Sequence, residues 1–179
     1  MALLRILAGP LLAVSLACAL GPADREHRVK AVFLFNFAQF VVWPDSVFQD
    51  STAPLVVGIL GADPFNDYLD ELVRGEKVAD HPIQVKRFRR IEEVKGCHVL
   101  FISTSEAQRM DAILPALKQK RILTVGESEP FFAHGGMVNF FTQAGKIRLR
   151  INLGEVQESG LIVSAKLLRL ADLSGPKRN

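Results

Sequence analysis

The chain of 179 residues is long enough for one domain that buries a single core without help from disulfides or a metal. A hydrophobic fraction of 49% and a positive mean hydropathy argue against an intrinsically disordered chain. The net charge of +3 is small and comes from mixed basic and acidic residues, which argues against a nucleic-acid-binding surface.

The first 19 residues resemble a cleavable secretion signal. Arg5 supplies a positive charge, residues 6–16 are apolar, and Ala17-Cys18-Ala19 fits the small-x-small rule for cleavage. We therefore expect the mature chain to begin near Leu20 and to function outside the cytoplasm. The alternative is a lipoprotein with acylated Cys18, for which the preceding residues match poorly. The apolar run is also shorter than the roughly 20 residues that a membrane anchor needs.

Residues 24–43 are predicted to form an unusually apolar helix. Phe33, Phe37 and Phe40 recur at helical spacing, and the other faces are apolar as well. A helix of this kind must be covered on more than one side, either within the domain or by a second subunit or partner. Trp43-Pro44 is expected to end the helix. Trp43, the sole tryptophan, is either a core residue or, if exposed, an interaction anchor.

Short apolar strands alternate with amphipathic helices in the middle of the chain. The predicted strands are residues 55–60, 82–88, 97–103 and 122–125, and the predicted helices are residues 64–74 and 105–120. Asp63 and Ser105 are the expected N-caps of the two helices. This alternation is typical of a parallel sheet that is covered by helices on both faces.

A period of two replaces this pattern after Gly135-Gly136. Residues 137–141 and 146–153 alternate apolar and polar side chains around Gln143-Ala144-Gly145, which predicts a hairpin with one solvated face. A short helix (155–159), a strand (161–164) and an apolar segment to residue 170 follow. We therefore predict a single α/β domain over residues 24–173, with a mostly parallel sheet, flanking helices and a C-terminal antiparallel hairpin. Residues 174–179 are expected to form a flexible tail.

No sequence motif for catalysis or metal binding stands out. The chain has no nucleophile elbow, dinucleotide-binding glycine motif or Walker loop, and its four histidines are not at metal-ligand spacing. We therefore expect no enzyme activity, no cofactor and no metal. Cys97 and His98 are neighbours in a strand and should point to opposite faces. As the one cysteine of the mature chain, Cys97 is expected to be a buried free thiol.

A ligand in an open α/β sheet binds where the parallel strands end. The polar or flexible residues expected there are Gly61, Asp63, Ser103, Ser105, Glu106 and Glu127. Helix capping explains Asp63 and Ser105 without any ligand.

Six segments, in the same order, resemble the YfiR family. The most specific is KAVFLFNFAQFVVWP, residues 30–44. The others are residues 60–65, 97–103, 135–140, 151–153 and 164–170. The resemblance covers nearly the whole predicted mature chain.

The resemblance implies a periplasmic, non-catalytic regulator. Such a protein represses an inner-membrane diguanylate cyclase by binding its periplasmic sensor domain, which lowers cyclic di-GMP and limits biofilm formation. The resemblance also implies a homodimer and an outer-membrane lipoprotein that can sequester the repressor. The family's cysteine in the first apolar strand corresponds here to Gly58, so Cys97 lacks its partner. A second disulfide is absent too, and redox control is not expected to carry over.

Three hypotheses about function follow. The first is the cyclase repressor, which would bind its partner through Phe37, Phe40, Trp43, Arg148, Arg150, Ser164 and Lys166. The second is a periplasmic small-ligand-binding module without a cyclase partner, with its site at the strand ends or beside Trp43 and the polar face of the hairpin. The third is an enzyme that uses Ser103 or Glu106. A wide exposed apolar patch would favour the first hypothesis, and a pocket with paired, perturbed titratable groups would favour the third.

Overall fold

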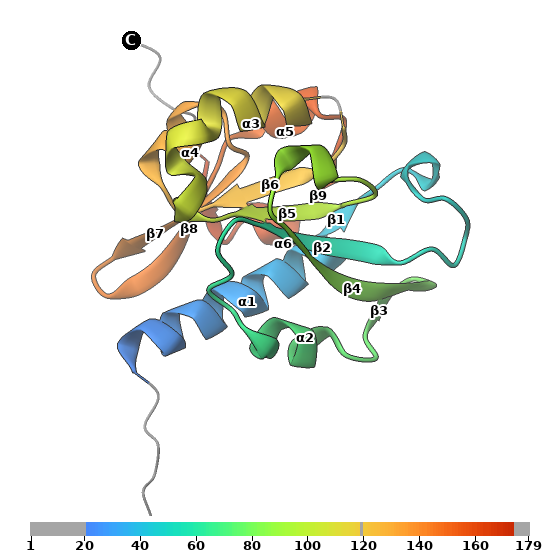
Figure 1. The fold of residues 1–179 in the computed structure, drawn as a ribbon, viewed down its shortest axis with the longest axis horizontal. Helices are drawn as coiled ribbons and strands as arrows, with labels where there is room; N and C mark the ends of the chain where they lie inside the picture. Colours follow the sequence, from blue (N-terminus) through green and yellow to red (C-terminus); the bar gives the residue numbers. More distant parts are fainter. Residues whose placement is uncertain (1–20, 119, 174–179) are drawn as a thin grey trace, which may run out of the picture.

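A computed structural model describes residues 21–118 and 120–173 (Figure 1). The predicted signal sequence, residues 1–19 with Cys18, and the predicted tail, residues 174–179, lie outside these residues. The described chain forms an eight-stranded sheet with the order β10-β8-β7-β6-β5-β2-β4-β3, and a separate two-stranded ribbon of β1 and β9. The predicted fold class, a mostly parallel α/β domain with an antiparallel hairpin, is confirmed.

The central strands of the sheet are parallel, as predicted for the first four of those that follow. They are β4 (His81–Phe88), β2 (Leu55–Leu60), β5 (Val99–Ile102), β6 (Leu123–Gly126) and β7 (Val138–Gln143). Antiparallel pairing occurs between β7 and β8 (Lys146–Ile151), and at the edge between β4 and β3 (Lys77–Val78). β10 (Ala171–Asp172) lies parallel to β8 at the opposite edge.

The β7–β8 hairpin closes through a two-residue turn. Gln143 pairs with Lys146, and Ala144 and Gly145 between them have φ angles of 50° and 70°. Positive φ at both central residues is the geometry of the turn that best matches the twist of a hairpin. The predicted face assignment also holds, because Leu149 and Ile151 are buried while Lys146 and Arg148 are exposed.

Two apolar clusters cover the two faces of the sheet. On β2, Val57 and Ile59 belong to one cluster, whereas Val56 and Leu60 belong to the other. The helices α1 (Pro22–Phe40), α2 (Asp67–Val73) and α6 (Ala165–Leu168) contribute to the first cluster. The helices α3 (Met110–Leu117) and α4 (Glu129–Ala133) contribute to the second, and Figure 1 shows the two groups on opposite sides of the sheet. The remaining α-helix is α5 (Leu153–Glu158).

The bounds of α1 and α2 differ from those predicted. α1 ends at Phe40 rather than at Trp43, because Val41 and Val42 form β1, which pairs antiparallel with β9 (Ile162–Val163). α2 begins at Asp67 rather than at Pro64. Asp63 instead caps the turn before it, where its Oδ1 accepts a hydrogen bond of 2.7 Å from the Phe65 backbone N–H.

The region around α3 also corrects the prediction. Ser103, rather than Ser105, is the capping residue, and its Oγ accepts from the Ser105 N–H at 3.4 Å. A 3₁₀ segment (Thr104–Arg109) then precedes α3, which ends at Leu117. The predicted inward side chains of this helix, Met110, Ile113, Leu114 and Leu117, are all buried. The sequence did not predict α4, nor the short 3₁₀ turns Asp45–Val47 and Ile91–Glu93.

None of the helices within residues 21–118 and 120–173 combines the length and hydropathy needed to cross a membrane.

Candidate functional site

One side of α1 is buried in the domain and the other remains partly in solvent. Leu34 and Phe37 are fully buried, whereas Val29 and Val32 are 44% and 38% exposed. Val29, Val32, Phe33, Asn36 and Phe40 are exposed or half-buried, and each lies three or four residues from another of the five, so they share one face of the helix. We call these five residues the α1 stripe. The sequence left open whether the domain or a partner covers this helix, and the exposure of these residues shows that the domain covers it only in part.

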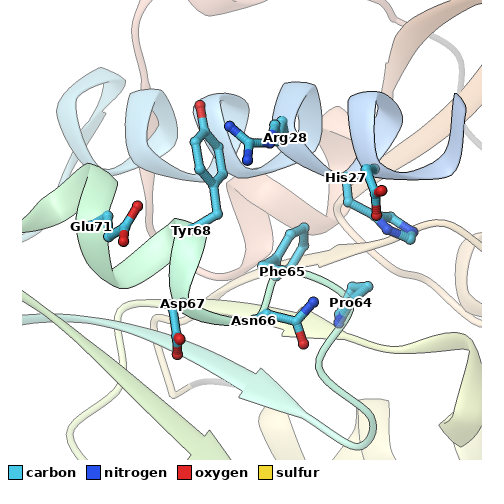
Figure 2. Close-up of a pocket in the computed structure, with 9 residues that line it drawn as sticks. His27, Arg28, Pro64, Phe65, Asn66, Asp67, Tyr68 and Glu71 are labelled. Carbon is cyan, nitrogen blue, oxygen red and sulfur yellow. The ribbon is translucent and has the colours of Figure 1, made fainter. Parts of the chain in front are cut away.

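A groove runs beside the α1 stripe, between α1 and α2. A cavity of about 380 Å³ is lined by stripe residues together with Arg28 and Tyr68. A second cavity, of about 360 Å³, is lined by Asp24, His27 and Arg28 of α1 and by residues 64–68 and 71 (Figure 2). Arg28 and Tyr68 belong to both cavities, and the Arg28 guanidinium lies 4.4 Å from the centroid of the Tyr68 ring. The two cavities therefore form one continuous surface.

The second cavity is acidic. Asp24, Asp67 and Glu71 line it, and none of the three forms an ion pair with another described residue. Arg28 is the one arginine or lysine among the lining residues. Three carboxylates against one guanidinium leave this end of the groove with a negative charge, beside the apolar α1 stripe.

Arg87 on β4 holds the loop that forms the floor of the acidic cavity. Its guanidinium forms ion pairs with Asp63 and Asp70, which keeps the pKa of Asp70 below its ordinary value and raises that of Arg87. Its Nη2 also donates to the Asn66 carbonyl at 3.0 Å. Asn66 has a φ of 49° and a ψ of −141°, a conformation that is unfavourable for a residue with a side chain. These three contacts stabilise the strained loop at the end of β2.

Three of the predicted site residues meet at the C-terminal end of α1. The Ser164 backbone N–H donates to the Phe40 carbonyl at 2.9 Å, and Lys166 Nζ lies 4.8 Å from the centroid of the Phe40 ring. Next to them, Val42 and Ile162 pair across the β1–β9 ribbon and are 60% and 66% exposed. These two exposed apolar side chains therefore lie near the C-terminal end of the α1 stripe.

The two predicted arginines lie on the hairpin. Arg150 lies 4.6 Å from the Phe132 ring centroid and 5.2 Å from that of Phe141, and it forms an ion pair with Glu129. Arg148 is exposed on the same strand. The contacts of Arg150 are thus with α4 and β7, so the structure does not group it with Phe40 and Lys166.

Phe37 and Trp43 are core residues in this chain. Phe37 is fully buried and packs against Phe33 and Phe140. Trp43 is 7% exposed, and its ring meets that of His98 edge-on, with centroids 5.9 Å apart. The core interpretation of Trp43 therefore fits the structure, and Phe40 is the one of the three predicted aromatic site residues that reaches the surface.

The polar residues at the strand ends are engaged with one another. Ser105 Oγ accepts from the Ala62 N–H at 3.0 Å, and Glu106, 8% exposed, forms an ion pair with Arg109. Glu127 and Glu26 both pair with Lys30, which is 4% exposed. These groups have structural partners, so their arrangement gives no support to a catalytic role for Ser103 or Glu106. No cluster of His, Cys, Asp or Glu among residues 21–118 and 120–173 could hold a metal ion.

Cys97 is a buried free thiol, as predicted. It is 6% exposed, and burial raises its pKa to about 12. It belongs to the cluster on the α3 side of the sheet, whereas the neighbouring His98 packs against Phe48 and Trp43.

The groove was not anticipated from the sequence. It depends on contact between Arg28 and Tyr68, which are far apart in the chain. A partial signal was present, because Val29, Val32 and Asn36 extend the helical face defined by Phe33 and Phe40.

The YfiR/HmsC-like family matches residues 27–172, which is most of the chain. This is a regulatory rather than a catalytic family, associated with the periplasm and with control of membrane diguanylate cyclases. A comparison with curated proteins gave no significant match.

Proposed function

The chain belongs to the YfiR/HmsC-like family, and from this premise we propose that it represses an inner-membrane diguanylate cyclase by binding the cyclase's periplasmic sensor domain. Repression lowers cyclic di-GMP in the cytoplasm. The observation in the structure that carries this proposal is the α1 stripe, an apolar helix face that the domain leaves partly exposed. The predicted secretion signal at residues 1–19 agrees with a periplasmic site of action.

The properties of the α1 stripe favour a protein partner. Contiguous exposed apolar surface on a soluble domain commonly marks an interaction site, and an aromatic residue such as Phe40 can act as an anchor there. The acidic cavity at one end and Lys166 at the other supply charges around an apolar centre, which is the usual arrangement of a protein–protein interface. The partner surface is then apolar, with a basic group that faces Asp24, Asp67 and Glu71.

Two further assemblies belong to this proposal. Self-association through the α1 stripe and the exposed Val42–Ile162 pair gives a homodimer when no cyclase is bound. An outer-membrane lipoprotein that binds the protein removes it from the cyclase and ends repression. Sedimentation of the purified mature chain alone measures the homodimer, and sedimentation with each candidate partner measures the complex.

A binding experiment tests the main proposal. The purified mature chain is titrated against the periplasmic sensor domain of each membrane diguanylate cyclase that the same genome encodes. We expect saturable binding to one of them, weakened at least about tenfold by Val32→Glu, because that change places a charge in the apolar contact. Leu173→Glu is the matched control, since Leu173 is also exposed, at 48%. Absence of binding to every sensor domain would contradict the proposal.

The acidic cavity favours a second candidate function, a small-ligand-binding module. Its volume of about 360 Å³, its position after β2 and its three carboxylates suit a small organic cation. Thermal melts of the mature chain with a series of organic amines measure the binding of such a cation. We expect a saturable rise in melting temperature that Glu71→Gln reduces. No rise with any amine would argue against this function.

A further inference from the structure

A small cavity lies at the amino ends of β2 and β5, away from the α1–α2 groove. Its volume is about 160 Å³, and it is lined by Phe48, Pro54, Lys86, Lys95, Gly96 and His98, among others. None of the described residues that line it carries a carboxylate group. Neither Lys86 nor Lys95 forms an ion pair with a described residue. The cavity is therefore positively charged.

His98 adds a buried hydrogen-bond donor that the described residues leave without a partner. Its side chain is 3% exposed, and its Nδ1 accepts a hydrogen bond of 3.1 Å from the Val56 backbone N–H. Because Nδ1 acts as the acceptor, the proton of the neutral ring is on Nε2. Nε2 is buried and has no acceptor among the described residues. Buried donors in folded proteins nearly always have partners, so this N–H is available to an acceptor oxygen.

Phe48 provides the apolar wall of the cavity. Its ring stacks on the His98 ring with centroids 4.6 Å apart, and it also stacks on the His81 ring with centroids 3.7 Å apart. A neighbouring cavity that also includes Phe48 is lined by Asp45, Asp50 and Asp80 and so disfavours an anion. The favourable site for a negative charge is the cavity lined by His98.

We propose that this cavity binds a small oxyanion, a carboxylate or phosphate group. Lys86 and Lys95 supply the charge, and His98 Nε2–H donates a hydrogen bond to an anion oxygen. The volume limits the ligand to the anionic group and a small apolar body against Phe48. The site does not depend on cyclase binding, and the α1 stripe contributes no residue to it.

Titration with inorganic phosphate and with acetate tests the proposal on the purified mature chain. Potassium chloride at the same ionic strength is the reference. We expect a saturable rise in melting temperature with at least one of the two anions, and the tighter of them identifies the preferred group. In a ¹⁵N-histidine-labelled sample, the signal of His98 Nε2 should shift with the same Kd.

A pair of double variants localises the binding. Lys86→Gln with Lys95→Gln should weaken the Kd at least about tenfold, because it removes both charges from the cavity. Lys118→Gln with Lys120→Gln removes the same charge from another exposed segment and should leave the Kd unchanged. The proposal is overturned by an absent response to both anions, by equal loss in the two double variants, or by a His98 signal that does not move.

Discussion

Gly58 on β2 faces Cys97, and a Cβ atom at Gly58 would lie 2.7 Å from the Cys97 Sγ. The same Cβ would lie 2.7 Å from the Phe88 ring and 3.0 Å from Leu100. The missing side chain at residue 58 is therefore what allows Cys97 to be packed beside β2. It also means that the position which the family resemblance aligns with a cysteine is next to Cys97 in space.

This relationship predicts that Gly58→Cys forms a disulfide with Cys97. The two positions are close enough for a disulfide bond, and closing the intervening loop should stabilise the oxidised variant by about 2–4 kcal/mol relative to its reduced form. Mass spectrometry under oxidising conditions detects the disulfide, and denaturant unfolding with and without reductant measures the stabilisation. Gly58→Ala, which crowds Phe88 without a new bond, is the control and should lose about 1–3 kcal/mol. Two free thiols after oxidation would contradict the geometry.

Cys97 in the unmodified protein should react slowly. Its burial and a pKa of about 12 keep the thiol protonated and inaccessible near neutral pH. We expect a thiol reagent to label the folded protein far more slowly than the protein unfolded in denaturant. Rapid labelling in native buffer, or a dimer linked through Cys97, would instead indicate an exposed and reactive position.

Trp43→Ala should act on stability rather than on binding. Trp43 is 7% exposed and packs on His98, so its truncation leaves a cavity in the core, at about 3–5 kcal/mol. We expect a large fall in melting temperature, while the remaining folded protein binds partners with unchanged affinity. Calorimetry and a binding titration at low temperature separate the two effects. Weakened binding with an unchanged melting temperature would contradict the core assignment and indicate that Trp43 contacts the partner.

His98 predicts a fall in stability on mild acidification. Burial lowers the pKa of this ring from 6.5 to about 4, so the unfolded chain binds a proton more readily than the folded one. The free energy of unfolding should therefore be unaffected by His98 above pH 6.5 and should fall between pH 6.5 and 4. His98→Asn should flatten this part of the curve, whereas His134→Asn, at an exposed histidine, should not. If the free energy of unfolding fell equally with pH in both variants, groups other than His98 would be responsible for the loss of stability.

The sequence predicted the central sheet well because its innermost strands, β2, β5 and β6, are buried on both faces. The runs in β2 and β5 are uniformly apolar, which is typical of strands in a parallel sheet that is covered on both faces. The sequence did not predict where α1 ends, because Val41 and Val42 are as apolar as the helix before them and nothing local marks the change from helix to strand. Their assignment to β1 depends on pairing with Ile162 and Val163, which local sequence cannot reveal.

The candidate site was predicted in part. The apolar excess of α1 predicted a helix that either the domain or a partner must cover, and Phe40 lies on the face that the domain leaves partly exposed. Sequence periodicity alone could not assign Trp43 to the core, because Trp43 follows the end of α1 and its burial depends on His98. The groove arises from the contact of Arg28 with Tyr68, and the loop beside it is held by Arg87 from another strand.

The cellular level of cyclic di-GMP tests the central claim most directly. It is measured in a strain that lacks this protein and is complemented with the wild type, Val32→Glu or the control Leu173→Glu, with equal periplasmic abundance verified. Loss of the protein should raise cyclic di-GMP, and the wild type and Leu173→Glu should lower it again. Val32→Glu, folded but with a charge in the α1 stripe, should leave it high. An unchanged level on loss of the protein, or full repression by Val32→Glu, would contradict repression through the α1 stripe.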